Sequence, residues 1–129
     1  MLKAQLLLAD KYKIYYLVVN GRHLVRDFID GLPLSNQKKI YSLLNFSAKN
    51  GPPKNKESFK KLHCKDRRIY EFRPKPYRIL CTFDGETKII LSHGFKKDKP
   101  KKQQIEIERA LKLFKQYFEG NKNENGKMV

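Results

Sequence analysis

The chain has 129 residues, and its 29 lysines and arginines against 13 aspartates and glutamates give a net charge of +16 at pH 7. No apolar run approaches the roughly 18 residues that a membrane-spanning helix needs, so we expect no membrane partner. The length suits one globular domain with a buried core. Self-repulsion at this charge predicts an anionic partner, with nucleic acid as the first choice and an acidic protein as the second.

The start of the chain and the cysteines indicate the compartment. The first ten residues, MLKAQLLLAD, hold a short apolar patch without a convincing signal-peptide cleavage site. Cys64 and Cys81 show neither metal-binding nor redox spacing, and Cys81 fits a small core residue. We therefore expect a cytoplasmic protein with reduced thiols.

The N-terminal third predicts one strand followed by two helices. Residues 12–19 are β-branched and aromatic, and Asn-Gly ends them. Residues 22–31 place their apolar side chains on one helical face, and Gly31 suits the position just after a helix. Ser35 is the expected N-cap of a second helix that ends near Gly51. The short connection predicts a helical hairpin.

A basic segment over residues 49–68 follows, with eight basic and two acidic residues. It predicts a loop that leads into a short strand over residues 59–62. Such charge runs are usually solvated. Because this one opens onto the central part of the chain, an anion-binding role is an equally good interpretation.

Residues 69–97 are the centre of the predicted fold. Three strand-like runs, at 69–73, 78–83 and 88–93, are separated by turn residues, and Asp84-Gly85 between the last two predicts an antiparallel hairpin. Alternation groups the side chains of Tyr70, Phe72, Ile79, Cys81 and Phe83 on one face of the sheet.

Arg73 and Arg78 belong to the other face, near a strand end and close to the corner at residues 94–97. Each of these cations alone is more often a solvated residue of a sheet edge. Together with His93, Lys96 and Lys97 they predict a site for a polyanion. Alternation also groups His93 with the apolar Ile89 and Leu91, so a structural histidine remains an alternative.

The last helix has the clearest pattern, with Pro100 near its start. Its apolar stripe consists of Ile107, Ala110, Leu111, Phe114 and Phe118. We expect this stripe to cover the sheet face that carries Tyr70 and Phe72. Glu119-Gly120 is the expected helix end, and residues 121–129 are the expected frayed tail.

Three motifs in order carry a family resemblance: YEFRPKPYRIL, then IILSHGFKK, then EIERALKLFKQY. Over about residues 12–118 the chain resembles the phage-derived Gp49-like, HigB-type branch of the RelE/ParE toxin superfamily. The resemblance implies an α+β fold with a small twisted, largely antiparallel sheet, an N-terminal helical hairpin and a C-terminal helix. Residues 1–129 would then form a single RelE-like domain whose core is 12–118, with 119–129 as a flexible tail.

The resemblance also implies a function and its partners. The chain would be the toxin of a type II toxin–antitoxin system, with an antitoxin of the helix-turn-helix type as its cognate partner. Many members of the superfamily cleave mRNA on the translating ribosome. The alternative is a non-catalytic protein of the same fold, either a gyrase-targeting toxin of the ParE branch or a phage regulatory module. A third reading is a basic protein whose only partner is an acidic antitoxin.

The family pattern carries over residue by residue. Arg73 matches the arginine of its Y-E-L-R element, Arg78 that of Y-R, and His93, Lys96 and Lys97 the H-G-F-x-K-K element. This chain departs from the pattern in two places. Phe95 is followed directly by Lys96, so the two lysines match only with a shift of one position. The usual K-T-P before the last helix is replaced by Lys-Pro-Lys at residues 99–101.

RNA can be cut without metal when its own 2′-OH attacks the adjacent phosphate. Arginine suits the stabilisation of the phosphorane, because it stays charged and forks onto two phosphate oxygens. Arg73 is the first choice for this role, Arg78 supports it, and the proton transfers belong to His93 or to Lys96 and Lys97. The lack of clustered carboxylates argues against a metal nuclease, and no cofactor is expected. The predicted RNA-binding residues are Lys60, Lys61, His63, Arg67, Arg68 and Lys99.

Overall fold

The computed structural model describes the backbone of residues 1–64 and 67–128, and the side chains of that range up to residue 120. One sheet forms the centre, with the strand order β1-β2-β7-β6-β5-β4 and β3 attached to β2. The strands are β1 (Leu2–Ala9), β2 (Lys13–Val19), β3 (Arg22–His23), β4 (Phe59–Leu62), β5 (Ile69–Phe72), β6 (Tyr77–Phe83) and β7 (Lys88–Lys96). The helices are α1 (Leu24–Asp30), α2 (Leu34–Asn50) and α3 (Pro100–Met128).

The sheet is mainly antiparallel, as expected. The predicted central hairpin is confirmed, since β6 and β7 pair antiparallel across the Asp84-Gly85 turn, where Gly85 has a φ of +89°. The short strand over Phe59–Leu62 is also confirmed as β4, at one edge of the sheet. The pairing of β2 with β7 is parallel, with Ile14 opposite Ile89, and was not expected.

Two strands were not expected from the sequence. The short β3 takes up Arg22 and His23, which were assigned to the first helix, so α1 begins only at Leu24. The longer one is β1. Its residues pair antiparallel with β2, from Leu2 opposite Val19 to Ala9 opposite Lys13. The run of three leucines lacks the polar–apolar alternation of a half-buried strand, so its pattern gave no strand signal. The structure therefore places β1 at the sheet edge opposite β4.

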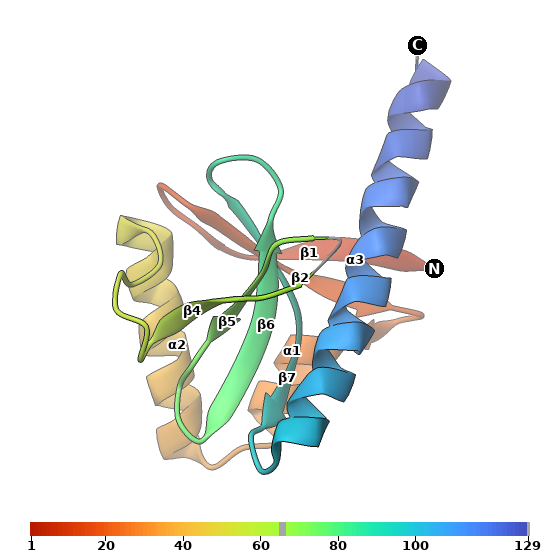
Figure 1. Cartoon of the computed structure of the whole chain (residues 1–129). Helices are drawn as coiled ribbons and strands as arrows, with labels where there is room; N and C mark the ends of the chain where they lie inside the picture. The colour runs from red at the N-terminus through yellow and green to blue at the C-terminus, as the bar shows by residue number, and fades with distance from the viewer. Residues whose placement is uncertain (65–66, 129) are drawn as a thin grey trace.

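Helices cover both faces of the sheet (Figure 1). Tyr70, Phe72, Ile79 and Cys81 do share one face, but α1 and α2 pack there, with Val25 and Leu44 in the same cluster. Helix α3 packs on the opposite face, so the expectation that it covers the Tyr70 face is wrong. The reason is that both faces are apolar: Leu17, Leu80 and Ile90 are fully buried beneath α3, together with Phe114.

The first two helices end where expected, directly before Gly31 and Gly51, whereas the start of α2 and the end of α3 differ from the expectation. Helix α2 begins at Leu34 with Pro33 as its N-cap, so Ser35 is not the cap. Gly31 keeps a right-handed conformation, with a φ of −82°, whereas Gly51 after α2 has a φ of +89° and packs against the ring of Tyr12. Helix α3 passes Gly120 and continues to Met128, so the expected tail is helical in the described residues, and residue 129 lies outside them.

In the described part of the chain, no helix combines the length and the apolar character that crossing a membrane requires.

Candidate functional site: an arginine pair around Glu71

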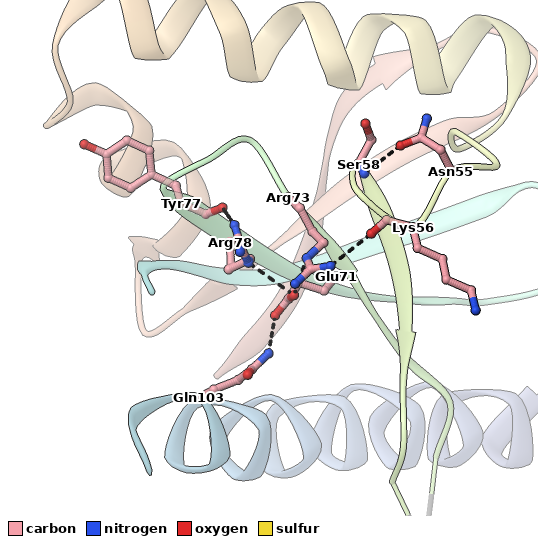
Figure 2. Close-up of polar contacts among 8 residues, drawn as sticks. All are labelled: Asn55, Lys56, Ser58, Glu71, Arg73, Tyr77, Arg78 and Gln103. Carbon is pink, nitrogen blue, oxygen red and sulfur yellow. Dashed lines mark hydrogen bonds and ion pairs between the residues drawn. The ribbon is translucent and has the colours of Figure 1, made fainter. Parts of the chain in front are cut away.

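The structure brings Arg73 and Arg78 together around one carboxylate. Glu71 lies in β5, Arg73 directly follows that strand, and Arg78 is the second residue of β6. Oε1 of Glu71 is 3.2 Å from Nε of Arg73 and 3.3 Å from Nε of Arg78. Figure 2 shows both guanidinium groups turned toward the Glu71 carboxylate. We call Arg73 and Arg78 the arginine pair. Alternation along β5 also puts Glu71 on the face of Arg73, but nothing in the sequence pattern indicates a role for it.

Hydrogen bonds to the backbone hold both members of the arginine pair, and a hydrogen bond from α3 holds Glu71. Nη1 of Arg73 donates to the carbonyl oxygen of Lys56 at 2.9 Å, and Nη1 of Arg78 donates to the carbonyl oxygen of Tyr77 at 2.9 Å. Nε2 of Gln103, in the first turn of α3, donates to Oε2 of Glu71 at 2.8 Å (Figure 2). The loop before β4, the central strands and α3 therefore all hold this site.

Burial separates the two arginines. Glu71 is fully buried, and the Arg78 side chain is 7% exposed, while that of Arg73 is 17% exposed. Burial lowers the pKa of Arg78; the Glu71 carboxylate opposes this, and the charge of Arg73 adds to it. Two positive charges and one negative charge leave the group with one net positive charge (2 − 1 = +1). Arg73, which is more accessible, is the member that can meet an anion.

Strand β4 adds one of the predicted lysines to the sheet face that carries Glu71 and Arg73. Lys60 is opposite Glu71, and Lys61 is opposite Tyr70. Directly opposed residues of an antiparallel pair point to the same face. Lys60, which is exposed, therefore shares the face of Glu71 and Arg73, and Lys61 belongs to the other face.

The two lysines at the end of β7 do not join the arginine pair as a group. The register places Phe95 opposite Arg78 and Lys96 opposite Tyr77. Lys96 is therefore on the face opposite to Arg78, contrary to the expected convergence of both lysines. Lys97 follows the strand, and its backbone N–H donates to the carbonyl oxygen of Pro76 at 3.1 Å. Lys99 is exposed in the loop before α3.

His93 lies on the α3 side of the sheet, because β7 is irregular there. Ile79 pairs with Gly94 and Cys81 with Leu91, so Ser92 and His93 together oppose Leu80. Such a β-bulge breaks the strict alternation of side chains. The expectation that His93 shares the face of Ile89 and Leu91 is therefore wrong.

The surroundings of His93 are those of a buried structural residue. It is 2% exposed, with Nδ1 3.1 Å from Oγ of Ser92 and Nε2 3.3 Å from Oε2 of Glu106. Burial, followed by the charge of Arg109, lowers the pKa of His93 to about 4. The imidazole is therefore neutral at pH 7.

The remaining predicted RNA-binding residues lie apart from the arginine pair. The Arg67 guanidinium is 4.1 Å from the centre of the Phe118 ring of α3. Arg68 borders a hollow with Tyr12, Tyr70 and Phe83 on the other side of the sheet, and His63 is exposed just after β4. Residues 65 and 66 of the predicted basic segment lie outside the described residues.

No metal-binding cluster accompanies the site within the described residues. Nowhere among them do three or more histidines, cysteines, aspartates or glutamates come close enough to hold an ion.

Comparisons with known proteins agree with this architecture. The family model "Phage derived protein Gp49-like (DUF891)" matches residues 27–115, a range that includes the arginine pair. The chain is similar to RelE in the crystal structure of the archaeal RelE–RelB complex from Pyrococcus horikoshii OT3, with a TM-score of 0.53 and 15% identity, over 67% of this chain and 96% of that chain. A comparison with curated protein sequences found no match to this chain. The likeness confirms the expected RelE-like α+β fold.

Proposed function

The chain belongs to the phage-derived Gp49-like family of RelE-like toxins, and we propose that it cleaves mRNA on the ribosome as the toxin of a type II toxin–antitoxin pair. The observation that carries the proposal is the arginine pair itself. One buried carboxylate holds two guanidinium groups, with one net positive charge left over at the surface of the sheet.

This arrangement suits attack of an RNA 2′-OH on the adjacent phosphate. The step adds negative charge to the phosphorane, and preorganised donors that meet this charge lower the barrier. Because Nε of Arg73 faces Glu71 and one Nη donates to Lys56, the guanidinium plane is fixed before the substrate arrives. In this proposal Arg73 is the group that contacts the phosphate. Arg78, which is more deeply buried, adds to the positive electrostatic potential at the phosphate.

The proton transfers fall to lysines in this proposal. His93 is nearly inaccessible and neutral at pH 7, so it does not supply the proton for the leaving 5′-oxygen. Lys60, on the face of Arg73, and Lys97, after β7, carry exposed ammonium groups that can donate it. The attacking 2′-OH loses its proton to a lysine that is neutral at that moment or to a group of the ribosome.

The partner proposed for this chain is an antitoxin of the helix-turn-helix type. Support comes from the similar RelE, whose structure is that of a RelE–RelB complex. The net charge of +16 also favours an acidic partner.

The test is mRNA cleavage in a reconstituted translation reaction, read by primer extension. Arg73→Ala leaves Glu71 paired with Arg78, so the fold should persist while cleavage falls by roughly 100-fold or more. Lys75→Ala is the matched control, since Lys75 is an exposed cation between the two arginines. Undiminished cleavage by a folded Arg73→Ala protein would reject the site.

The burial of Arg78 and His93 favours a second candidate, a non-catalytic binding protein. In that case growth arrest occurs with intact mRNA, and DNA damage would indicate a gyrase-type target. In a third reading, an acidic antitoxin is the only partner, and a measurement of RNA binding distinguishes it from the other two. If about five lysines or arginines contact phosphates, the logarithm of the affinity for single-stranded RNA should fall with the logarithm of the salt concentration with a slope near −3.5. A slope near zero excludes RNA as the partner.

A further inference from the structure

A second basic surface lies along the flank of α3 that faces the N-terminal strands. A hollow of about 570 Å³ there is lined by Val19, Asn20, Arg22, Leu24, Arg109 and Leu113. The first four residues come from β2, the β2–β3 turn, β3 and the start of α1, and the last two from α3. None of these residues belongs to the arginine pair or contacts it in any described interaction.

Within the described part of the chain, the two arginines of this hollow have no anionic partner. Arg22 stands on the strand side and Arg109 on the helix side, and both are exposed. Among the described residues neither guanidinium has a hydrogen bond or an ion pair. Two unpaired guanidinium groups on opposite walls can each fork onto a carboxylate or a phosphate.

The apolar part of the lining favours a peptide over RNA. Val19, Leu24 and Leu113 are half-buried, so they offer aliphatic surface next to the charges. Among the described residues no aromatic ring lines this hollow, whereas proteins usually hold unpaired bases by stacking them on aromatic rings. The rings of Tyr15 and Tyr117 line a neighbouring hollow that contains neither Arg22 nor Arg109. A ligand that presents aliphatic and acidic side chains together matches both features.

The surface extends further along the same flank of α3. A second hollow of about 260 Å³ is lined by Leu2, Ala4, Tyr15, Gln116 and Gly120, together with the cations Lys3 and Lys88 and with Tyr117. Residues 109, 113, 116 and 120 recur at helical spacing and so share one face of α3. At 1.5 Å per residue, this face is about 17 Å long, which suits about three turns of a helix.

We propose that this flank of α3, with Arg22 and Arg109 at one end, is the docking site for an acidic amphipathic segment of a protein partner. Carboxylates of the segment pair with Arg22 and Arg109, and its aliphatic side chains pack on Leu24 and Leu113. The proposal does not depend on RNA cleavage, because the arginine pair lies outside this surface.

Two synthetic peptides of identical composition test the proposal by fluorescence anisotropy. Both contain only leucine and glutamate, and one places all leucines on one helical face, while the other is scrambled. The patterned peptide should bind, and Arg22→Ser with Arg109→Ser should weaken it roughly tenfold. The matched control, Lys112→Ser with Lys115→Ser, removes the same charge from the other flank of α3, beside Arg67, and should change binding less than about twofold.

The apolar contact has its own variant. Leu113→Asn keeps the charge and should also weaken the patterned peptide. All five substituted residues are exposed or half-buried, so the variants should fold, and circular dichroism checks this.

Three results would overturn the proposal. One is equal binding of the scrambled peptide, and another is equal loss in the two double variants. The third is displacement of the patterned peptide by a uridine oligonucleotide that requires the same two arginines, which would make the surface an RNA site. Cleavage of mRNA by the Arg22→Ser/Arg109→Ser variant should remain unchanged, so that failure here and failure of the proposed nuclease are told apart.

Discussion

Gln103, in the first turn of α3, donates a 2.8 Å hydrogen bond to the carboxylate of Glu71 in strand β5. The same carboxylate holds Arg73 and Arg78 through its other oxygen. The C-terminal helix and the candidate site are therefore joined through one buried acid.

The first prediction concerns that acid. Glu71→Gln removes the only negative charge of the group and leaves two guanidinium groups facing each other, one of them almost fully buried. Breaking a buried charge pair by removing one partner costs about 3–5 kcal/mol in the free energy of unfolding. Urea unfolding at pH 7 measures this loss of stability. Glu86→Gln, on the exposed β6–β7 turn, is the control and should change stability by less than about 0.5 kcal/mol.

The second prediction concerns Gln103. Gln103→Leu removes a donor to a buried carboxylate oxygen, so stability should fall by about 1–3 kcal/mol, less than for Glu71→Gln. The exposed neighbour Gln104 supplies the control, Gln104→Leu. In a double variant with Glu71→Gln, the two losses should not add, because both substitutions act on one contact. Simple additivity would show that the hydrogen bond does not link the helix to the site.

The third prediction is a pH dependence set by His93. Its pKa is about 4 in the folded protein and about 6.5 in an unfolded chain, so the unfolded state binds more protons between these values. Stability from this group is thus complete above pH 6.5 and is lost as the pH falls toward 4, by about 3 kcal/mol.

Urea unfolding between pH 4 and pH 7.5 measures this dependence. His93→Gln should show a flatter profile than the parent, while His63→Gln, at an exposed position, should keep the parental slope. Parallel profiles for the parent and His93→Gln would contradict the assignment. The charged groups of α3 that face His93, Glu106 and Arg109, are unchanged in all of these proteins.

The fourth prediction tests the contact between α1 and the end of β7. A methyl group at Gly94 would overlap the ring of Phe28 in α1. Gly94→Ala should therefore destabilise the protein by about 1–3 kcal/mol, the usual range for overpacking a core. Phe28→Leu in the same chain should recover part of the loss. Gly120→Ala meets no atom within 4 Å in helix α3, and should be neutral or stabilising by up to about 1 kcal/mol.

Local signals in the sequence predicted the parts of the fold that depend on neighbours in the chain. The β6–β7 hairpin followed from Asp84-Gly85, and the common face of Phe72 and Ile79 followed from alternation. The position of α3 did not follow, because Leu80 on the opposite face is as apolar and as buried as Ile79. When both faces of a strand are apolar, the pattern does not tell which helix covers which face.

In the candidate site, too, the sequence predicted what depends on neighbours in the chain and not what depends on pairing between distant strands. Arg73 and Arg78 meet because a short connection joins β5 to β6, which the two prolines between them already indicated. The separation of Lys96 from Arg78 depends on the register of β7, and the turn of His93 toward α3 depends on a bulge opposite Leu80. Neither register nor bulge leaves a mark in the residue pattern, since both arise from pairing between strands.

The parallel contact of β2 with β7 bears on how this protein is made. Lys13 meets Lys88 and Tyr16 meets Leu91, so the two strands are joined only after most of the chain has been synthesised. The N-terminal hairpin of β1 and β2 is synthesised first, and until β7 is available the edge of β2 that pairs with it is unpaired. Unpaired strand edges pair readily with other chains. Contacts this distant in sequence also slow folding. A nascent or truncated chain that stops before Lys88 therefore exposes an adhesive strand edge, which only the completed protein conceals.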